Sequence, residues 1–240
     1  MPYKYTAVII EPRKHKALEF VLYNALENLS EDWAVILFHG TKNADYAKGI
    51  AERFGAKNLE LVQLDVENLN QVTYSELLAS KTIIYEHVDT EYMLIFQTDS
   101  MIFKEHKDLI YQFIELGIDY VGAPWLICGY PPTKERDFIG NGGMSLRKVS
   151  TMRKIMQTYK WNPNAEWHED LFFTKSYPGI QCKKPPYELA KQFCVDEVFS
   201  PISFGCHRAW CHSHFNELAK LYPEVLKLKE LQEEEPTQGL

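Results

Sequence analysis

Apolar runs of strand length alternate with amphipathic segments of helix length over the first 125 residues of the chain. Strands are predicted at residues 5–12, 33–40, 59–64, 92–97 and 118–125. Helices are predicted between them, at residues 15–29, 43–55, 73–88 and 105–116. Strands separated by helices of this length are typical of βαβ units. The predicted fold class is therefore α/β, with a Rossmann-like, mainly parallel sheet flanked by helices.

Short-range signals mark several ends of these elements. Gly40 ends the second strand, and Gly55 stops the second helix, as glycine commonly does. Thr73 and Glu76 have the spacing of a capping box, so a helix is expected to begin at that point.

The second half of the chain loses this alternation. A long loop is expected at residues 126–140, followed by a glycine-rich segment at 140–147. Further helices are predicted at residues 147–159, 167–177, 187–198 and from residue 223 onward. The charged end of the chain is expected to be a solvated tail.

We interpret residues 1–240 as one domain, because no internal repeat or low-complexity linker divides the chain. Residues 1–125 would form a nucleotide-binding half, and residues 126–222 an acceptor-binding and catalytic half. Residues 223–240 would form a charged C-terminal helix and tail.

The composition narrows the class of protein. Hydrophobic residues make up 45% and charged residues 25% of the chain, as in globular proteins that bury a large core. The net charge of −7 argues against a surface for nucleic acid or an anionic membrane. The sequence has no apolar run long enough for a transmembrane segment and no signal-peptide pattern. With five cysteines, an odd number, we expect a reduced, cytoplasmic protein with free thiols.

The fourth predicted strand is followed by a carboxylate. Tyr92–Phe96 is apolar at every position, which is typical of a central strand covered on both faces. Ligand sites in open α/β sheets lie just outside the carboxyl ends of the strands, where Asp99 follows this one. Asp99 therefore either binds a divalent cation, Mg²⁺ or Mn²⁺, together with a substrate diphosphate, or forms part of a polar turn.

Two other segments carry candidate chemistry, and each has a structural alternative. Gly142 and Gly143 lie in a segment with three glycines in four residues, which suits close approach to a ligand or a tight turn. Glu169 and Asp170 open a predicted helix, where acidic residues are common because they complement the helix dipole. A carboxylate there can also act as a general base toward an acceptor hydroxyl.

Cysteines and histidines crowd into nine residues near the end of the chain: Cys206, His207, Cys211, His212 and His214. Their spacing matches no ordinary structural zinc site, and no second Cys/His pair lies upstream. We favour one of these histidines as a nitrogen ligand to a metal that it shares with Asp99.

Four segments, taken in order, resemble a known type of enzyme. They are QTDS at 97–100, YVGAPW at 120–125, GNGGMSLR at 140–147 and EDLFF at 169–173. The set, over about residues 5–212, resembles the glycosyltransferase-A fold, and in particular a little-characterised family described only as glycosyltransferase-like. The Fringe-like inverting transferases are similar in outline, with a D-x-D element, a glycine-rich strand and an E-D-V segment.

The resemblance implies roles at the donor side of a site. Asp99 would be the metal carboxylate of the D-x-D element, with Thr98 beside it in the nucleotide site. Gln97 replaces the first Asp of that element, and it would hydrogen-bond the nucleotide ribose instead, which leaves metal dependence open. His207 would be a second metal ligand, and Arg208 would neutralise the departing diphosphate.

Further residues follow from the same resemblance. Gly142 and Gly143 would line the donor site, and Arg13 would lie at the nucleotide end, at the carboxyl edge of the sheet. Asp170 would be the general base, with Glu169 as the neighbour that could exchange roles with it.

The function that the resemblance implies is a glycosyltransferase dependent on Mn²⁺ or Mg²⁺. It would move a sugar from a nucleotide-diphosphate sugar to a glycan or other hydroxyl acceptor, with inversion. A non-catalytic module that binds nucleotide sugars or glycans is one alternative, and Gln97 favours it. A metal-dependent nucleotidyltransferase or phosphohydrolase is another, but it would need a second carboxylate near Asp99 or a glycine-rich loop after the first strand.

Overall fold

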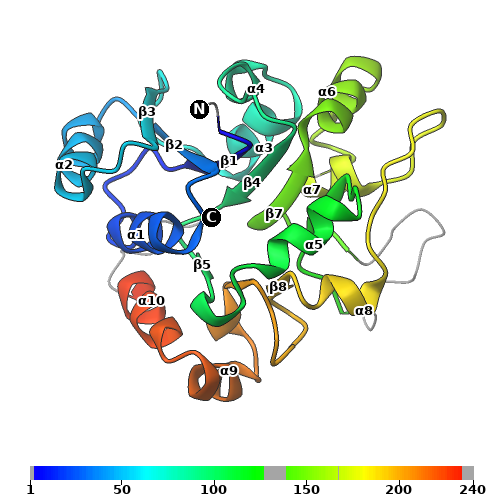
Figure 1. Cartoon of the computed structure of the whole chain (residues 1–240). Helices are drawn as coiled ribbons and strands as arrows, with labels where there is room; N and C mark the ends of the chain where they lie inside the picture. The colour runs from blue at the N-terminus through cyan, green and yellow to red at the C-terminus, as the bar shows by residue number, and fades with distance from the viewer. Residues whose placement is uncertain (1–2, 127–138, 167, 234–240) are drawn as a thin grey trace.

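A six-stranded sheet forms the centre of the protein, between two layers of helices (Figure 1). The computed structural model describes residues 3–126, 139–166 and 168–233. The strand order is β3-β2-β1-β4-β7-β6. The strands are β1 (Tyr5–Ile10), β2 (Trp33–His39), β3 (Leu59–Gln63), β4 (Tyr92–Phe96), β6 (Tyr120–Gly122) and β7 (Met144–Lys148).

The sheet is mainly parallel, as predicted, and β4 is an interior strand. β1 pairs in parallel with both β2 and β4, and β2 pairs in parallel with β3. β7 runs antiparallel to β4 and to β6. The glycine-rich segment thus leads into a reversed strand beside β4.

Both faces of the sheet are buried, which explains the unbroken apolar runs of its strands. In β1, Ala7 and Ile9 belong to one apolar core, whereas Val8 and Ile10 belong to the other. Successive side chains of a strand point to opposite faces, so an interior strand supplies both cores.

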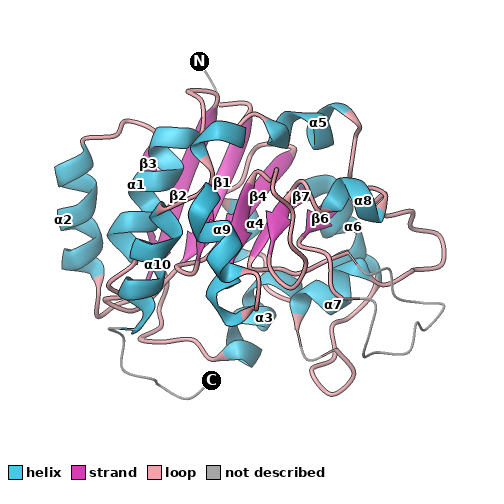
Figure 2. Cartoon of the chain, turned by 90° about the horizontal axis from the view of Figure 1, so that it is seen from below, coloured by secondary structure: helices cyan, strands magenta, loops and turns pink. Residues whose placement is uncertain are grey.

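Helices cover each of these cores (Figure 2). One core receives side chains from α1 (Leu18–Asn28), α2 (Ala44–Phe54), α5 (Leu109–Glu115), α8 (Tyr187–Ala190), α9 (Phe215–Leu221) and α10 (Glu224–Glu233). The other receives them from α3 (Gln71–Ala79), α4 (Ile83–Glu86), α6 (Val149–Thr158) and α7 (Glu169–Thr174).

Several predicted elements differ from those observed. The single helix predicted at 73–88 is wrong, because α3 and α4 are separate. The capping box joins Asn70 and Thr73 through reciprocal bonds of 2.9 Å, one turn earlier than the pair predicted with Glu76. The helix predicted at 105–116 is a short 3₁₀ turn, Lys104–His106, followed by α5.

The long helix predicted at 187–198 is also wrong. Only α8 is helical there, and the chain then forms the two-residue strand β8 (Cys194–Val195). A strand of two residues carries no periodicity of its own, so its pairing partner decides it. Most of the loop predicted at 126–140 lies outside the described residues.

A second, three-stranded sheet joins distant parts of the chain, in the order β5-β9-β8. β5 (Ser100–Ile102) follows β4 after a turn of three residues, and β9 (Gly205–His207) lies antiparallel to β5. In this register Ser100 is opposite His207. The pairing brings the late histidine to the carboxyl end of β4, next to Asp99.

The C-terminal helix α10 forms as predicted, and it packs on the core through Val225 and Leu228. Gln232 on this helix donates from Nε2 to the carbonyl oxygen of Thr98 at 2.6 Å. Residues 234–240 of the predicted tail, EEEPTQGL at 233–240, are outside the described residues. Within the described part of the chain, no helix has both the length and the apolar character needed to cross a bilayer.

Candidate functional site

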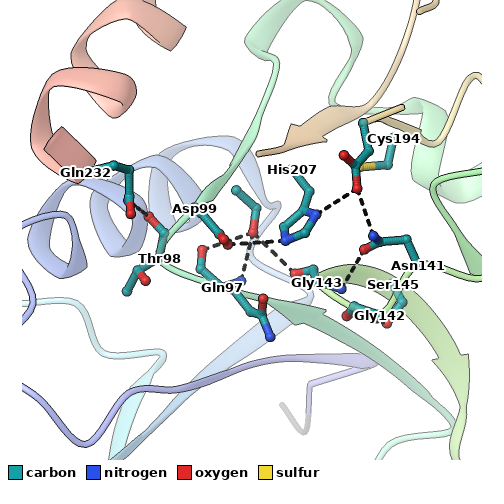
Figure 3. A network of polar contacts seen from close by, with 12 residues as sticks. Gln97, Thr98, Asp99, Asn141, Gly142, Gly143, Ser145, Cys194, His207 and Gln232 are labelled. Atoms are coloured by element: carbon teal, nitrogen blue, oxygen red, sulfur yellow. Dashed lines mark hydrogen bonds and ion pairs between the residues drawn. The ribbon is translucent and has the colours of Figure 1, made fainter. Parts of the chain in front are cut away.

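Asp99 and His207 meet at the junction of the two sheets (Figure 3). The Nε2 atom of His207 lies 3.4 Å from Oδ1 of Asp99. This Oδ1 atom is buried, and it has no hydrogen-bond partner among the described residues. The turn itself is held by Ser100, whose hydroxyl accepts from the Gln97 amide at 2.8 Å and donates to the Gln97 carbonyl at 2.9 Å. The Oδ1 atom of Asp99 is therefore not needed to close the turn.

The other ring nitrogen of His207 is held by a carboxylate that the sequence did not single out. Nδ1 of His207 lies 3.0 Å from Oδ2 of Asp196, just after β8. The same Oδ2 accepts from Nδ2 of Asn141 at 2.7 Å, and Oδ1 of Asp196 lies 2.9 Å from Nε2 of His212. Asp196 is only 5% exposed, so one buried carboxylate joins three polar side chains.

The opposite charges of these groups stabilise each other's charged forms. Burial opposes the charged form of His207, but the carboxylates of Asp99 and Asp196 outweigh it and raise the pKa of His207 to about 10. Burial likewise opposes the charge on Asp99, but His207 and Arg208 hold the pKa of Asp99 below its ordinary value. Bonds from His207 and His212 lower the pKa of Asp196 against the effect of burial.

The pair of Asp99 and His207 fits a divalent cation. Oxygen and imidazole ligands lie at about 2.1 Å from such ions, so two ligands of one ion are at most about 4.2 Å apart. The observed 3.4 Å between Oδ1 and Nε2 is within that limit, and the buried Oδ1 atom lacks any other partner among the described residues. No group of three or more His, Cys, Asp or Glu side chains in the described ranges is arranged to hold a metal. The remaining ligands would therefore come from a substrate or from water.

The glycine segment packs directly on these side chains. A Cβ atom at Gly143 would lie 2.1 Å from Nε2 of His207, and one at Gly142 would lie 2.6 Å from Oε1 of Glu169. Both distances are far below van der Waals contact. The glycines are thus required because side chains of the site itself approach the backbone closely; the φ angle is not positive at either residue.

Asp170 lies on the other side of the same segment. Its Oδ2 atom accepts from the backbone N–H of Gly142 at 3.1 Å, and its Oδ1 atom accepts from the N–H of Leu171 at 2.6 Å. Asp170 is half-buried. Burial first, and the charge of Glu169 second, raise the pKa of Asp170 to about 7. A carboxylate with this pKa can accept a proton near neutral pH.

Glu169 has a different environment from its neighbour. Its Oε1 atom accepts from Nη2 of Arg147 at 3.0 Å, and its Oε2 atom accepts from the hydroxyl of Ser75 on α3 at 3.2 Å. Arg147 is fully buried on β7, and Glu169 is 5% exposed. Glu169 therefore holds α7 against β7 and α3 through a buried ion pair.

Gln97, Thr98 and Arg208 surround Asp99. Thr98 is buried, and Gln97 is half-buried at the end of β4. Arg208 is exposed, and among the described residues it is the only non-glycine with a positive φ, at 46°. Its N–H donates to the carbonyl oxygen of Asp99 at 3.0 Å. The left-handed conformation, which costs about 1–2 kcal/mol, is thus held next to the pair of Asp99 and His207.

Arg13 lies at the same edge of the sheet, after β1. Its guanidinium forms two bonds of 2.8 Å to the buried carboxylate of Glu11. A pocket of about 530 Å³ lies here, within the usual size range of small-molecule sites. It is lined by Pro12, Arg13, Lys14, Lys42, Glu67 and Asn68.

Among the described residues, the remaining histidines and cysteines do not form a zinc site. His212 is bonded to Asp196, and its ring stacks on His214 with centroids 5.6 Å apart. Cys206 is buried in β9, whereas Cys211 is exposed. No disulfide bond joins the cysteines of the described ranges.

The structure adds three site residues that the sequence analysis missed: Asn141, Arg147 and Asp196. Arg147 had a detectable signal, because a charged residue in the alternating pattern of a buried strand must find a partner. Asn141 lay inside the glycine segment, but its side chain received no role. Asp196 had no local signal, because its partners lie 11, 16 and 55 residues away, beyond the spacing of any helix or strand pattern.

Comparison with protein-family models identifies one family. The family model described as "Protein of unknown function (DUF5672)" matches residues 58–207, more than half of the chain. No curated protein matches the chain.

Solved structures were also compared. The mannosyltransferase PcManGT from Pyrobaculum calidifontis, in complex with GDP-Man and Mn²⁺, has a TM-score of 0.51 at 12% identity, over 80% of this chain and 60% of that chain. Residues 1–349 of TarS from S. aureus have a TM-score of 0.48 at 14% identity. That match covers 70% of this chain and 53% of the TarS chain, so this protein spans about half of its length.

The match to the mannosyltransferase, at this low identity, is evidence for the fold alone. The order of strands and helices in this chain is that of a glycosyltransferase-A-like α/β protein with a mainly parallel sheet. By its sequence, this chain belongs to the family described as "Protein of unknown function (DUF5672)".

Proposed function

We propose that the protein is a metal-dependent glycosyltransferase. It would move a sugar from a nucleotide-diphosphate sugar to an acceptor hydroxyl, with inversion at the sugar carbon. The observation that carries the proposal is that two adjacent glycines lie between a histidine suited to a cation and a carboxylate suited to a general base. Gly143 packs against His207, which forms the proposed cation site with Asp99. The backbone N–H of Gly142 donates to Asp170, whose pKa is raised to about 7.

Asp170 is the proposed general base. It accepts the proton of the acceptor hydroxyl while the hydroxyl oxygen forms a bond to the sugar carbon. The bond between that carbon and the donor phosphate breaks, and its electron pair goes to the phosphate oxygen. Glu169 is less suited to this role, because Arg147 and Ser75 already bind its two oxygens.

The leaving diphosphate gains negative charge as the bond breaks. A bound Mn²⁺ or Mg²⁺ would supply positive charge there, held by Asp99 and His207. The exposed side chain of Arg208 follows His207 directly and would neutralise the same charge. Gln97 and Thr98 would line the donor site beside Asp99.

The nucleotide end of the donor would occupy the pocket at the ends of β1–β3. Arg13, Lys14 and Lys42 line this pocket, and carboxylates pair with two of them, Glu11 with Arg13 and Glu67 with Lys42. The carboxyl ends of these parallel strands and of β4 lie at one edge of the sheet, as a ligand site of this fold requires.

Donor binding tests the proposal first. UDP-, GDP- and dTDP-sugars are added with and without Mn²⁺, and thermal unfolding of wild type, Asp99→Ala and Asp45→Ala is measured. Asp45 is an exposed carboxylate in the first turn of α2, and it serves as the matched control. A donor at 100 times its Kd stabilises the fold by about 2.7 kcal/mol, so a rise of roughly 5–11 °C is expected in wild type and control.

The Asp99→Ala variant should lose the part of this rise that depends on Mn²⁺. Product formation from the donor that binds then separates enzyme from binding module. A donor that binds with Mn²⁺ but is neither transferred to any acceptor nor hydrolysed would favour the non-catalytic alternative. A wild-type protein that binds none of these donors would refute the proposal.

A further inference from the structure

Asp196 is a buried carboxylate beside the candidate site, and it has three polar side chains as partners. Its two oxygens lie within hydrogen-bonding distance of Nδ1 of His207 (3.0 Å), Nε2 of His212 (2.9 Å) and Nδ2 of Asn141 (2.7 Å). The residue is 5% exposed. Burying a carboxylate is costly unless bonds compensate it, so its position calls for an explanation.

The geometry decides which nitrogen of His207 carries the proton when the imidazole is neutral. An ionised carboxylate only accepts hydrogen bonds, so Nδ1 of His207 must be the donor to Asp196. In the neutral imidazole, Nε2 then carries the lone pair. This Nε2 atom is the one that faces Oδ1 of Asp99, at 3.4 Å.

We propose that Asp196 is the positioning residue of the cation site. By holding Nδ1 of His207, it sets the tautomer and the ring orientation that present Nε2 to a divalent cation. Asp196 itself touches neither the cation nor the substrate. This inference rests on the proposed function, because it assumes that Asp99 and His207 bind the cation.

The same carboxylate also positions the glycine segment. Asn141 donates to Oδ2 of Asp196, and its own Oδ1 accepts from the backbone N–H of Gly143 at 2.9 Å. The carbonyl oxygen of Gly143 lies 3.3 Å from the hydroxyl oxygen of Ser100, as a second and longer contact of the hydrogen donated to Gln97. Figure 3 shows this chain of bonds running from the turn after β4 to Asn141 and across to His207. One oxygen of Asp196 therefore orients both the metal-binding histidine and the backbone that packs against it.

A purely structural role makes a different prediction. If Asp196 only ties β8 and β9 to the glycine segment, its loss would lower the stability of the fold but would leave the affinity of the folded protein for metal unchanged. If it positions His207, the metal affinity of the folded protein should fall. Partners of this kind usually contribute about 10–100-fold to metal affinity.

The experiment measures Mn²⁺ binding directly. Free Mn²⁺ is followed by electron paramagnetic resonance in the presence of UDP and, separately, GDP, at a temperature where every variant is folded. The full chain is compared with Asp196→Ala and Asp196→Asn, so that a folding failure of one leaves the other. Both should raise the Kd for Mn²⁺ by roughly 10–100-fold.

Two matched controls accompany these variants. His212→Gln removes the partner of the opposite oxygen of Asp196, and its effect on Mn²⁺ affinity should stay well short of tenfold. Asp119→Asn removes the charge of another buried carboxylate, which accepts from Thr151 at 2.8 Å and from the N–H of Lys183 at 2.7 Å. It should lower stability without changing Mn²⁺ affinity.

Each outcome decides the inference. Folded Asp196 variants that bind Mn²⁺ as wild type does would overturn it, while the proposed function would stand if Asp99→Ala still loses the ion. If His212→Gln loses as much Mn²⁺ affinity as the Asp196 variants, the inference would also be overturned, because the effect would then depend on His212. Failure of the wild-type protein to bind Mn²⁺ with either nucleotide would refute the cation site, and this inference with it.

Discussion

Replacement of Asp170 by asparagine removes one negative charge from a half-buried position beside Gly142 and Glu169. The side chains of aspartate and asparagine have nearly the same shape, so the variant tests the charge itself. We expect Asp170→Asn to make the protein more stable at pH 8 and to remove most of its transfer activity.

The effect on stability follows from the raised pKa. The pKa of Asp170 rises from 3.8 to about 7, through burial first and the charge of Glu169 second. The folded state thus binds this proton more tightly than the unfolded state. The contribution of the carboxyl group to stability is complete below about pH 4 and is lost as the pH rises to about 7. At 1.36 kcal/mol per pKa unit, the full loss is roughly 4 kcal/mol.

Asp170→Asn avoids this loss of stability, but the variant also loses a hydrogen bond that offsets part of the gain. Asp170 uses both oxygens to accept from the N–H groups of Gly142 and Leu171, whereas asparagine has one acceptor oxygen. Losing a hydrogen bond to a charged group costs roughly 1.5–3 kcal/mol. The net gain at pH 8 is then about 1–2.5 kcal/mol, which corresponds to a melting temperature roughly 2–10 °C higher. At pH 5 most of the charge penalty is gone, and the variant should be no more stable than wild type.

Thermal unfolding at pH 5 and pH 8 and product formation across the same pH range are the assays. The wild-type rate should fall below pH 7 as Asp170 takes up its proton. The variant should lose roughly 10²–10⁴-fold in kcat, with the KM for the donor little changed. A variant that melts below wild type at pH 8 would contradict the account of the charge. A variant with full activity would exclude Asp170 as the base and move the binding-module alternative to first place.

Two further variants give one prediction on stability and one on metal binding. Glu169→Gln leaves the buried guanidinium of Arg147 without its counter-charge and should destabilise the fold by about 3–5 kcal/mol, measured by denaturant unfolding; an unchanged midpoint would mean that the ion pair is not needed. Gly143→Ala would place a Cβ atom 2.1 Å from Nε2 of His207, so it should displace the ring and abolish Mn²⁺ binding in the same resonance assay. The control Gly49→Ala, in the interior of α2 with its nearest contact at 3.4 Å, should keep the metal and gain about 0.5–1 kcal/mol of stability.

The sequence alone determined the sheet and the position of the first metal-binding candidate. Apolar runs such as Tyr92–Phe96 report burial on both faces, because neighbouring side chains of a strand face opposite sides of the sheet. The alternation with amphipathic helices then gives parallel strands, and the carboxyl edge of such a sheet is where Asp99 was expected to act. These properties are local or periodic, so they can be read without knowing which segments pair.

The second half depended on pairings that no local pattern reports. β5, β8 and β9 are two or three residues long, so they have no periodicity, and a helix was wrongly expected where β8 forms. Only the pairing of Ser100 with His207 brings the histidine to Asp99, more than a hundred residues away in the chain.

Only the tertiary structure distinguishes the roles of Glu169 and Asp170. Both acids begin the same helix, and the sequence left either one as the base. Arg147 on β7 and Ser75 on α3 bind the carboxylate of Glu169, whereas that of Asp170 accepts only from backbone N–H groups. Burial first, and the charge of Glu169 second, raise the pKa of Asp170 to about 7. Asp196 is a further case, because its partners His207, His212 and Asn141 lie 11, 16 and 55 residues away in the chain. Charges and hydrogen bonds act across space, so their consequences for a side chain exist only once the chain has folded.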